Sequence, residues 1–170
     1  EVADEFGFSR EEQDEWACHT QSAACDAMKA GRLDDEIFPV EIHEGKKTSV
    51  LERDEGPRPD TTIAGLAKLP PVFGHKSTVT GKPGSVTAGN APGVNDGGDV
   101  CLVMSAEKAA GLGLKPLCTI LDYAEVSQPP KDIATVPGLA IRKILEQNDL
   151  TLARIKLVEI KEAFAAVVRV

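Results

Sequence analysis

Four cysteines and three histidines carry the side chains of this 170-residue chain that are best suited to metal binding or nucleophilic chemistry. Cys18 and Cys25 are seven residues apart, so on a helix they would face the same side. A metal or redox pair and simple helix packing both fit that spacing. The cysteine and histidine spacings match no metal-binding pattern, so we expect no metal site. Cys101 and Cys118 lie in apolar runs, where cysteine behaves as a small hydrophobe.

The segment from 86 to 98 is the stretch best suited to a ligand. It holds four glycines, so its backbone can approach a small molecule or another loop closely. The run Val100–Met104 that follows is apolar on both faces, which predicts a strand buried in a layered sheet. Ligands of α/β proteins usually bind at such strand ends. The residues therefore indicate a small-molecule or cofactor site at 86–98, with a tight structural turn as the alternative.

The overall composition excludes several classes of protein. A net charge of −8 argues against a surface for nucleic acid or an anionic membrane, and no apolar run approaches membrane-spanning length. The chain begins without methionine and shows no signal-peptide pattern, so we expect a fragment or a processed chain. The cysteines show no CxxC pair and no metal-ligand spacing. We therefore expect a reducing compartment, the cytoplasm. No Ser-His-Asp order, phosphate-binding loop or catalytic carboxylate pair is recognisable.

The first part of the chain predicts an irregular α+β arrangement. Ser9 and Glu12 form a capping box, since the serine can accept from first-turn amides and the glutamate can reach back. The helix they begin should end near Gly31, because glycine tolerates the positive φ of a C′ position. Similar signals predict two short strands at 37–42 and 49–51, a helix at 61–69 capped by Asp60, and a surface loop at 74–84.

The second part of the chain predicts alternating strands and helices. The expected elements are strands at 100–104, 117–121 and 155–160, and helices that begin at Ser105, Pro137 and near Lys161. This alternation is typical of a layered α/β sheet.

Six segments resemble the thiolase (acetyl-CoA acetyltransferase) family, and they follow the family's order across nearly the whole chain. They are Phe8–Ala17, Ala30–Ile37, Arg58–Thr62, Leu66–Leu69, Val86–Ala91 and Glu162–Ala165. The resemblance implies part of a thiolase fold, a layered α/β/α arrangement. Residues 1–84 would be part of the loop domain that covers coenzyme A. Residues 85–104 would end the N-terminal core domain, and residues 105–170 would begin the C-terminal core domain.

The resemblance implies an acyl-CoA C-acyltransferase, which catalyses thiolysis of a 3-oxoacyl-CoA or Claisen condensation of two acyl-CoA molecules. The coenzyme A thioester is then a substrate, and no cofactor is permanently bound. In the family, one cysteine is acylated, a second moves protons, and a Gly-His-Pro histidine helps to activate the first. The first precedes this segment and the others follow it, so the chain alone is expected to be inactive. The family also implies a homodimer or homotetramer.

Several residues receive binding roles from the resemblance. Arg58 would lie near the adenine and phosphate end of coenzyme A, which a guanidinium suits. The residues expected beside the pantetheine arm or the thioester are Thr61, Gly65, Phe73, Ala91, Pro92, Gly93, Ala163 and Phe164. The residues expected to shape the loop are Asn90, Asn95 and Asp96. For Arg58 the alternative is a solvated or ion-paired side chain. For Thr61, Gly65 and Phe73 the alternative is ordinary core packing.

The chain departs from the family pattern at several places, and Lys161 and Pro92 bear most directly on the chemistry. Lys161 stands where the family has the asparagine of Asn-Glu-Ala-Phe, whose amide holds a water of an oxyanion hole. Loss of such a donor commonly costs on the order of a hundredfold in rate, and burying the lysine charge would be costly. Pro92 replaces the serine of Ala-Ser-Gly, so one hydrogen bond is lost. Two alternatives stay open: a catalytically altered protein that binds acyl-CoA or lipid, and, if these residues are the whole chain, an assembly or binding module.

Overall fold

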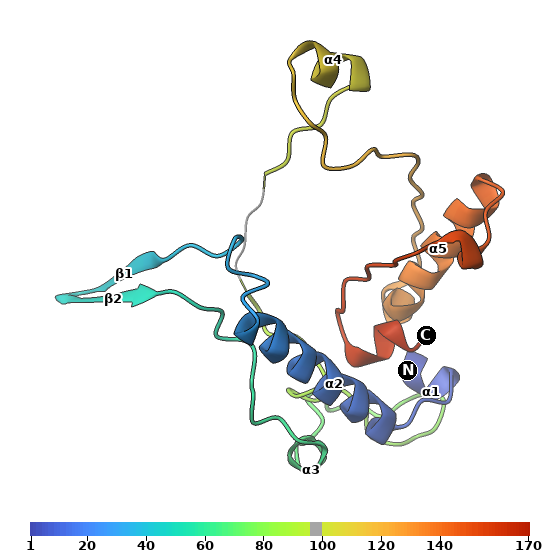
Figure 1. The fold of residues 1–170 in the computed structure, drawn as a ribbon. Helices are drawn as coiled ribbons and strands as arrows, with labels where there is room; N and C mark the ends of the chain where they lie inside the picture. The colour runs from blue at the N-terminus through green and yellow to red at the C-terminus, as the bar shows by residue number, and fades with distance from the viewer. Residues whose placement is uncertain (96–99) are drawn as a thin grey trace.

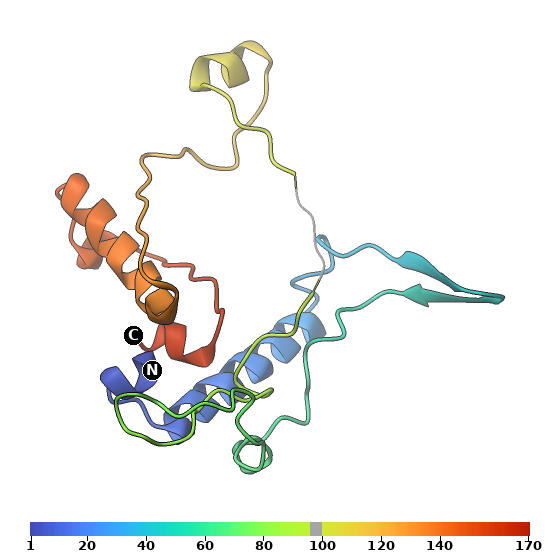
Figure 2. The same cartoon turned by 180° about the vertical axis from the view of Figure 1, so that it is seen from behind.

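The computed structural model describes residues 1–95 and 100–170 (Figure 1). The α-helices are α1 (Val2–Glu5), α2 (Arg10–Lys29), α3 (Ile63–Leu66), α4 (Ala106–Gly111) and α5 (Val136–Gln147). The strands are β1 (Val40–Glu44) and β2 (Lys47–Leu51), and the 3-10 helices are η1 (Pro130–Thr135), η2 (Leu152–Arg154) and η3 (Ala165–Val168). In both views α4 stands away from the helices around α2, and the two termini lie close together (Figures 1 and 2).

Helix α2 is the longest helix of the described residues, and α3 and η3 pack against it. The Ser9 Oγ accepts from the Glu12 amide at 3.1 Å, and the Ser9 amide donates to Glu12 Oε2 at 2.8 Å, so the expected capping box is present. Gly31 follows the helix end with a φ of +69°, a conformation that glycine adopts at little cost. The expected helix is therefore confirmed at both ends.

Two small apolar clusters make up the core. Val2, Ala134 and Val167 form the first cluster. Ala17 of α2, Leu66 of α3 and Ala165 of η3 form the second. Since η3 contributes to both clusters, the last residues of the chain hold the start of the chain, α2 and α3 together.

The hairpin β1–β2 projects from this core (Figure 1). The two strands are antiparallel and pair Val40 with Leu51 and Glu44 with Lys47. Every residue of both strands is exposed. The two strands expected here are thus confirmed, with β1 beginning a few residues later than predicted.

The three strands expected after residue 99 are wrong. Residues 100–104, 117–121 and 155–160 belong to no strand, and Val100 and Leu117 are fully exposed. A strand requires backbone donors and acceptors from a neighbour. Among the described residues, the only sheet is the β1–β2 hairpin. The three apolar runs therefore have no neighbouring strand with which to pair.

The expected helices are confirmed in part. Ser105 caps α4 by accepting from the Lys108 amide at 3.2 Å, and α5 begins beside Pro137 as expected. Helix α3 is shorter than predicted, and its cap is the Thr62 hydroxyl rather than Asp60. The helix expected near Lys161 begins only at Ala165 and is a 3-10 helix.

A search of the described helices for one long and apolar enough to cross a membrane finds none.

Candidate functional site

A tight turn at residues 87–90 forms the centre of the candidate site. The Thr87 amide donates to Asn90 Oδ1 at 2.8 Å, and the Gly89 amide donates to Thr87 Oγ1 at 3.2 Å. Thr87 is 0% exposed and Asn90 is 4% exposed. Because side chains supply the hydrogen bonds, this buried turn keeps its backbone groups satisfied without a sheet.

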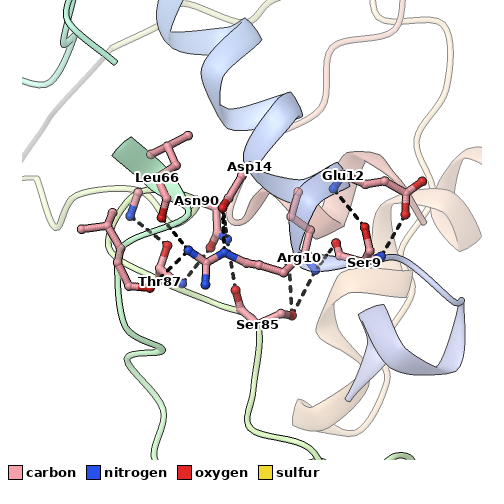
Figure 3. Close-up of polar contacts among 11 residues, drawn as sticks. Ser9, Arg10, Glu12, Asp14, Leu66, Ser85, Thr87 and Asn90 are labelled. Carbon is pink, nitrogen blue, oxygen red and sulfur yellow. Dashed lines mark hydrogen bonds and ion pairs between the residues drawn. The ribbon is translucent and has the colours of Figure 1, made fainter. Parts of the chain in front are cut away.

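An ion pair of α2 between buried Asp14 and partly buried Arg10 holds this turn from one side (Figure 3). Asp14, which is 1% exposed, accepts from Arg10 Nε at 2.9 and 2.8 Å and from Asn90 Nδ2 at 3.0 Å. The Nη2 group of Arg10 donates onward to the carbonyl oxygens of Leu66 at 2.7 Å and Leu69 at 3.2 Å. Such a pair is tolerated inside a protein only when its remaining groups are bonded. The pair therefore ties α2, α3 and the turn together.

Gln13 and Ser85 extend the buried network. Gln13 Nε2 donates to the Ser9 carbonyl at 3.1 Å and to Ser85 Oγ at 3.0 Å. The Ser85 carbonyl accepts from Asn90 Nδ2 at 3.1 Å. The start of α2 and residues 85–90 thus form one polar unit.

The C-terminal segment closes over the turn. The Ala165 amide donates to the Asn90 carbonyl at 3.0 Å, and Ala165 itself is 2% exposed. Farther along α2, Thr20 Oγ1 donates to Glu162 at 3.4 Å, and Arg169 pairs with Glu12 at 2.9 Å. Residues 162–169 therefore contact α2 at several points, from Glu12 to Thr20.

A cavity of about 130 Å³ lies beside this contact. Its apolar lining includes Phe73, Val86 and Phe164, and its polar lining residues are Glu1, Gln13, His75, Ser77 and Ser85. An apolar hollow with a few fixed polar groups is typical of a site for part of a small molecule.

The structure brings together several residues that the resemblance assigned to coenzyme A. Ala91, Pro92 and Gly93 follow Asn90 directly, and Ala163 and Phe164 precede Ala165, so the Asn90–Ala165 hydrogen bond joins the two groups. Phe73 and Phe164 both line the cavity. Pro92 and Gly93 are exposed, and so is Asn95, whose side chain lies close to Gly93. Asp96 lies outside the described residues.

Arg58 and Thr61 lie in the loop before α3, Gly65 lies in α3, and none of the three lines the 130 Å³ cavity. The Arg58 amide donates to Gln21 Oε1 at 2.8 Å, while Thr61 Oγ1 donates to the Arg58 carbonyl at 2.9 Å. Arg58 is exposed, and its guanidinium has no hydrogen-bond or ion-pair partner in the part of the chain that the structure describes. Gly65 is exposed in α3. These residues are available to a ligand but do not share the cavity.

A larger open cavity of about 610 Å³ lies at the C-terminal end of α2. Its lining includes Lys29 and Arg53 but also Asp34 and Glu52. It does not include Arg58. The opposed charges give it no clear preference for an anion.

Lys161 and the cysteines differ from expectation. Lys161 is exposed, so its charge carries no cost of burial; its carbonyl accepts from the Ala163 amide at 2.9 Å. Cys101 and Cys118 are exposed rather than packed in strands. Cys25 is buried, and Cys18 Sγ lies 3.7 Å from the Thr61 carbonyl. The described residues contain no group of three side chains placed to hold a metal ion.

Sequence reasoning missed the roles of Arg10, Asp14 and Gln13. The one signal was the opposite charge of Arg10 and Asp14 at a spacing of four residues, which usually marks an exposed pair on a helix. Their burial depends on residues 66–69 and 85–90, which come from elsewhere in the chain.

Comparison with known proteins gives the context of this arrangement. The family model for the N-terminal domain of thiolase matches residues 1–107, and that for the C-terminal domain matches residues 114–170. The chain is 43% identical over 166 residues to an acetyl-CoA acetyltransferase of Allochromatium vinosum, covering 97% of this chain and 40% of the relative. It is 41% identical over 165 residues to a beta-ketoadipyl-CoA thiolase of Pseudomonas aeruginosa, covering 97% of this chain and 39% of the relative.

Solved structures agree with these relatives. The acetyl-CoA acetyltransferase of Bacillus anthracis matches with a TM-score of 0.87 and 43% identity, over 99% of this chain and 41% of that one. The acetyl-CoA acetyltransferase of Syntrophomonas wolfei matches with a TM-score of 0.81 and 34% identity, over 99% of this chain and 40% of that one. The chain spans about 40% of the length of these relatives. The fold expected from the resemblance is confirmed as part of the thiolase fold, and the chain belongs to the thiolase family.

Proposed function

We propose that the protein carrying this chain is an acyl-CoA C-acyltransferase. It would cleave a 3-oxoacyl-CoA by thiolysis or run the reverse Claisen condensation. The chain would supply part of the surface that holds the coenzyme A thioester, which enters as a substrate, with no permanently bound cofactor. The supporting observation is the Asn90–Ala165 hydrogen bond, which joins small residues of the N-terminal match to Ala163 and Phe164 of the C-terminal match.

The domain division expected from the resemblance belongs to this proposal. Residues 1–84 would cover coenzyme A, residues 85–104 would end the N-terminal core domain, and residues 105–170 would begin the C-terminal core domain. The gap between the two family matches, from 107 to 114, lies close to the second of these boundaries.

The chemistry of the contacts suits a coenzyme A thioester. Its pantetheine arm is slender, and the small residues Ala91, Gly93 and Ala163 leave room for backbone to approach it. Phe73 and Phe164 offer apolar surface at the 130 Å³ cavity. Arg58 presents an exposed guanidinium, the group that best matches a phosphate in geometry.

A thiolase-like protein that binds acyl-CoA or lipid without catalysis is the second candidate. Lys161 favours it, because an ammonium group stands where the family uses an asparagine amide. The lysine is exposed, so it is not tied to a fixed geometry as an oxyanion-hole donor must be.

Thiolysis of acetoacetyl-CoA by the whole protein distinguishes the two candidates. We expect measurable turnover that Lys161→Asn raises by about ten- to a hundredfold in kcat. Lys156→Asn, at another exposed lysine, is the matched control and should leave kcat unchanged. Coenzyme A binding without turnover in either form would favour the non-catalytic candidate. Strong activity with no gain from Lys161→Asn would refute a harmful role for the lysine.

We propose a homodimer or homotetramer in the cytoplasm. The family resemblance supports the assembly, and the four unpaired cysteines suit a reducing compartment. Light scattering coupled to size-exclusion chromatography of the whole protein tests the assembly, and a monomer would refute it.

A further inference from the structure

We infer that Asp14, held by Arg10, is a positioning residue for the coenzyme A-binding surface. It would act by fixing the carbonyl of Asn90, to which the Ala165 amide binds. This inference rests on the proposed function, since the surface in question is the one proposed to hold the thioester.

The first step concerns the side chain of Asn90, whose hydrogen-bonding groups are occupied. Its Oδ1 accepts from the Thr87 amide at 2.8 Å, and its Nδ2 donates to Asp14 at 3.0 Å and to the Ser85 carbonyl at 3.1 Å. These bonds come from three different residues, so they favour one orientation of the side chain. Asp14 is the charged partner among them, and hydrogen bonds to charged groups are the strong ones.

The second step concerns what holds Asp14 itself. Its side chain is 2% exposed and pairs at 2.8 Å with Arg10, whose side chain is 21% exposed. Arg10 also reaches the carbonyl oxygens of Leu66 and Leu69. The position of Asn90 is therefore set against α2 and the end of α3 together.

The third step links Asn90 to the proposed binding surface. The Asn90 carbonyl accepts the Ala165 amide at 3.0 Å, and Phe164, the neighbour of Ala165, lines the cavity with Phe73. The cavity lining includes neither Arg10 nor Asp14, so neither is expected to touch the thioester. Because the Asn90 carbonyl anchors Ala165, a loosened Asn90 would weaken binding of coenzyme A at this surface from a distance.

The test compares four variants of the whole protein: Asp14→Asn, Asn90→Asp, the double variant that exchanges the two residues, and the control Asp26→Asn. Asp26 lies on the same helix in an exposed pair with Lys29 at 3.7 Å. The readouts are kcat and KM for coenzyme A in thiolysis, and hydrogen exchange at the Ala165 amide. The second readout does not depend on activity.

We expect Asp14→Asn and Asn90→Asp each to raise KM about tenfold with kcat within about twofold, and to speed exchange at Ala165. The double variant should recover part of both effects, because Asn at 14 and Asp at 90 restore a donor and acceptor pair. Asp26→Asn should match the wild type. If Asp14→Asn does not fold, Arg10→Lys replaces it, since lysine keeps the charge but not the fork that reaches α3.

A lower melting temperature with unchanged KM would overturn the inference, and so would unchanged exchange at Ala165. Failure of the proposed function looks different. In that case the wild type neither turns over nor binds coenzyme A, and exchange at Ala165 alone decides whether Asp14 positions Asn90.

Discussion

The Ala165 amide donates a hydrogen bond to the Asn90 carbonyl at 3.0 Å, although the two residues belong to matches with different thiolase domains. The resemblance led us to expect Ala91 and Phe164 beside the same thioester, and this hydrogen bond joins their neighbours in the chain. A backbone bond between two buried residues leaves little freedom for either segment to shift. The strip 90–93 and the pair Ala163 and Phe164 are therefore held as neighbours.

Gly89 should not tolerate a side chain. A Cβ at this position would meet the Leu66 side chain and lie 2.7 Å from Leu69 Cδ1. We expect Gly89→Ala to lower the free energy of unfolding by about 1–3 kcal/mol through overpacking. Gly138→Ala is the control: a Cβ on this exposed helical glycine meets nothing within 4 Å, so it should stabilise by about 0.5–1 kcal/mol. Urea unfolding measures both, and equal effects would refute the steric explanation.

The capping box of α2 should contribute to stability. Ser9→Ala removes the hydroxyl that accepts from the Glu12 amide, which should cost about 1 kcal/mol. Ser22→Ala, at an exposed position inside the same helix, removes no cap and should cost nothing. Thermal unfolding of the two variants checks this, and similar melting temperatures would contradict the role of Ser9.

Glu12 should make the stability of the fold depend on pH in the acidic range. The hydrogen bond from the Ser9 amide, helped by the Ser9 hydroxyl and by Arg169, lowers the pKa of Glu12 below its ordinary value of 4.5. A carboxyl with a lowered pKa stabilises the fold above the unfolded-state pKa, and this contribution is lost as pH falls through the folded-state pKa. We therefore expect stability to fall below pH 4.5 and Glu12→Gln to flatten that dependence. Glu15→Gln, an exposed control on the same helix, should leave the slope unchanged; a flattened slope there would argue against the cap.

Much of the helical fold could be predicted from the sequence because its signals are local. Ser9 with Glu12, Ser105 and Pro137 each begin a helix as expected. The absence of strands at 100–104 and 117–121 could not be predicted, because a strand forms only where another segment pairs with it. Apolar residues indicate that a segment favours burial, not that a partner lies beside it.

Only part of the candidate site could be predicted from the sequence. The resemblance assigned Ala91 and Phe164 to the same thioester. The burial of Asp14 against Arg10 could not be predicted, because two opposite charges on a helix look the same in sequence whether they are exposed or covered. The pair is covered by residues 66–69 and 85–90, which come from other parts of the chain.

Arg58 should contribute to affinity but not to stability. Its guanidinium is exposed and unpartnered among the described residues, so Arg58→Ala removes no structural contact. We expect the Kd for coenzyme A to rise about fivefold or more, as for loss of a charged hydrogen bond, with an unchanged melting temperature. Arg142→Ala, an exposed arginine of α5, is the control. Loss of the effect with dephospho-coenzyme A would assign the contact to the 3′-phosphate, and an unchanged Kd for both ligands would refute the role.

Hydrogen exchange of the whole protein with and without coenzyme A tests the central claim most directly. Bound coenzyme A should slow exchange at the amides of Ala91 and Gly93 and at those of Ala163 and Phe164, and should leave the exposed hairpin β1–β2 unchanged. Slowing at only one of the two groups, or only elsewhere in the chain, would contradict the claim that these segments form one binding surface.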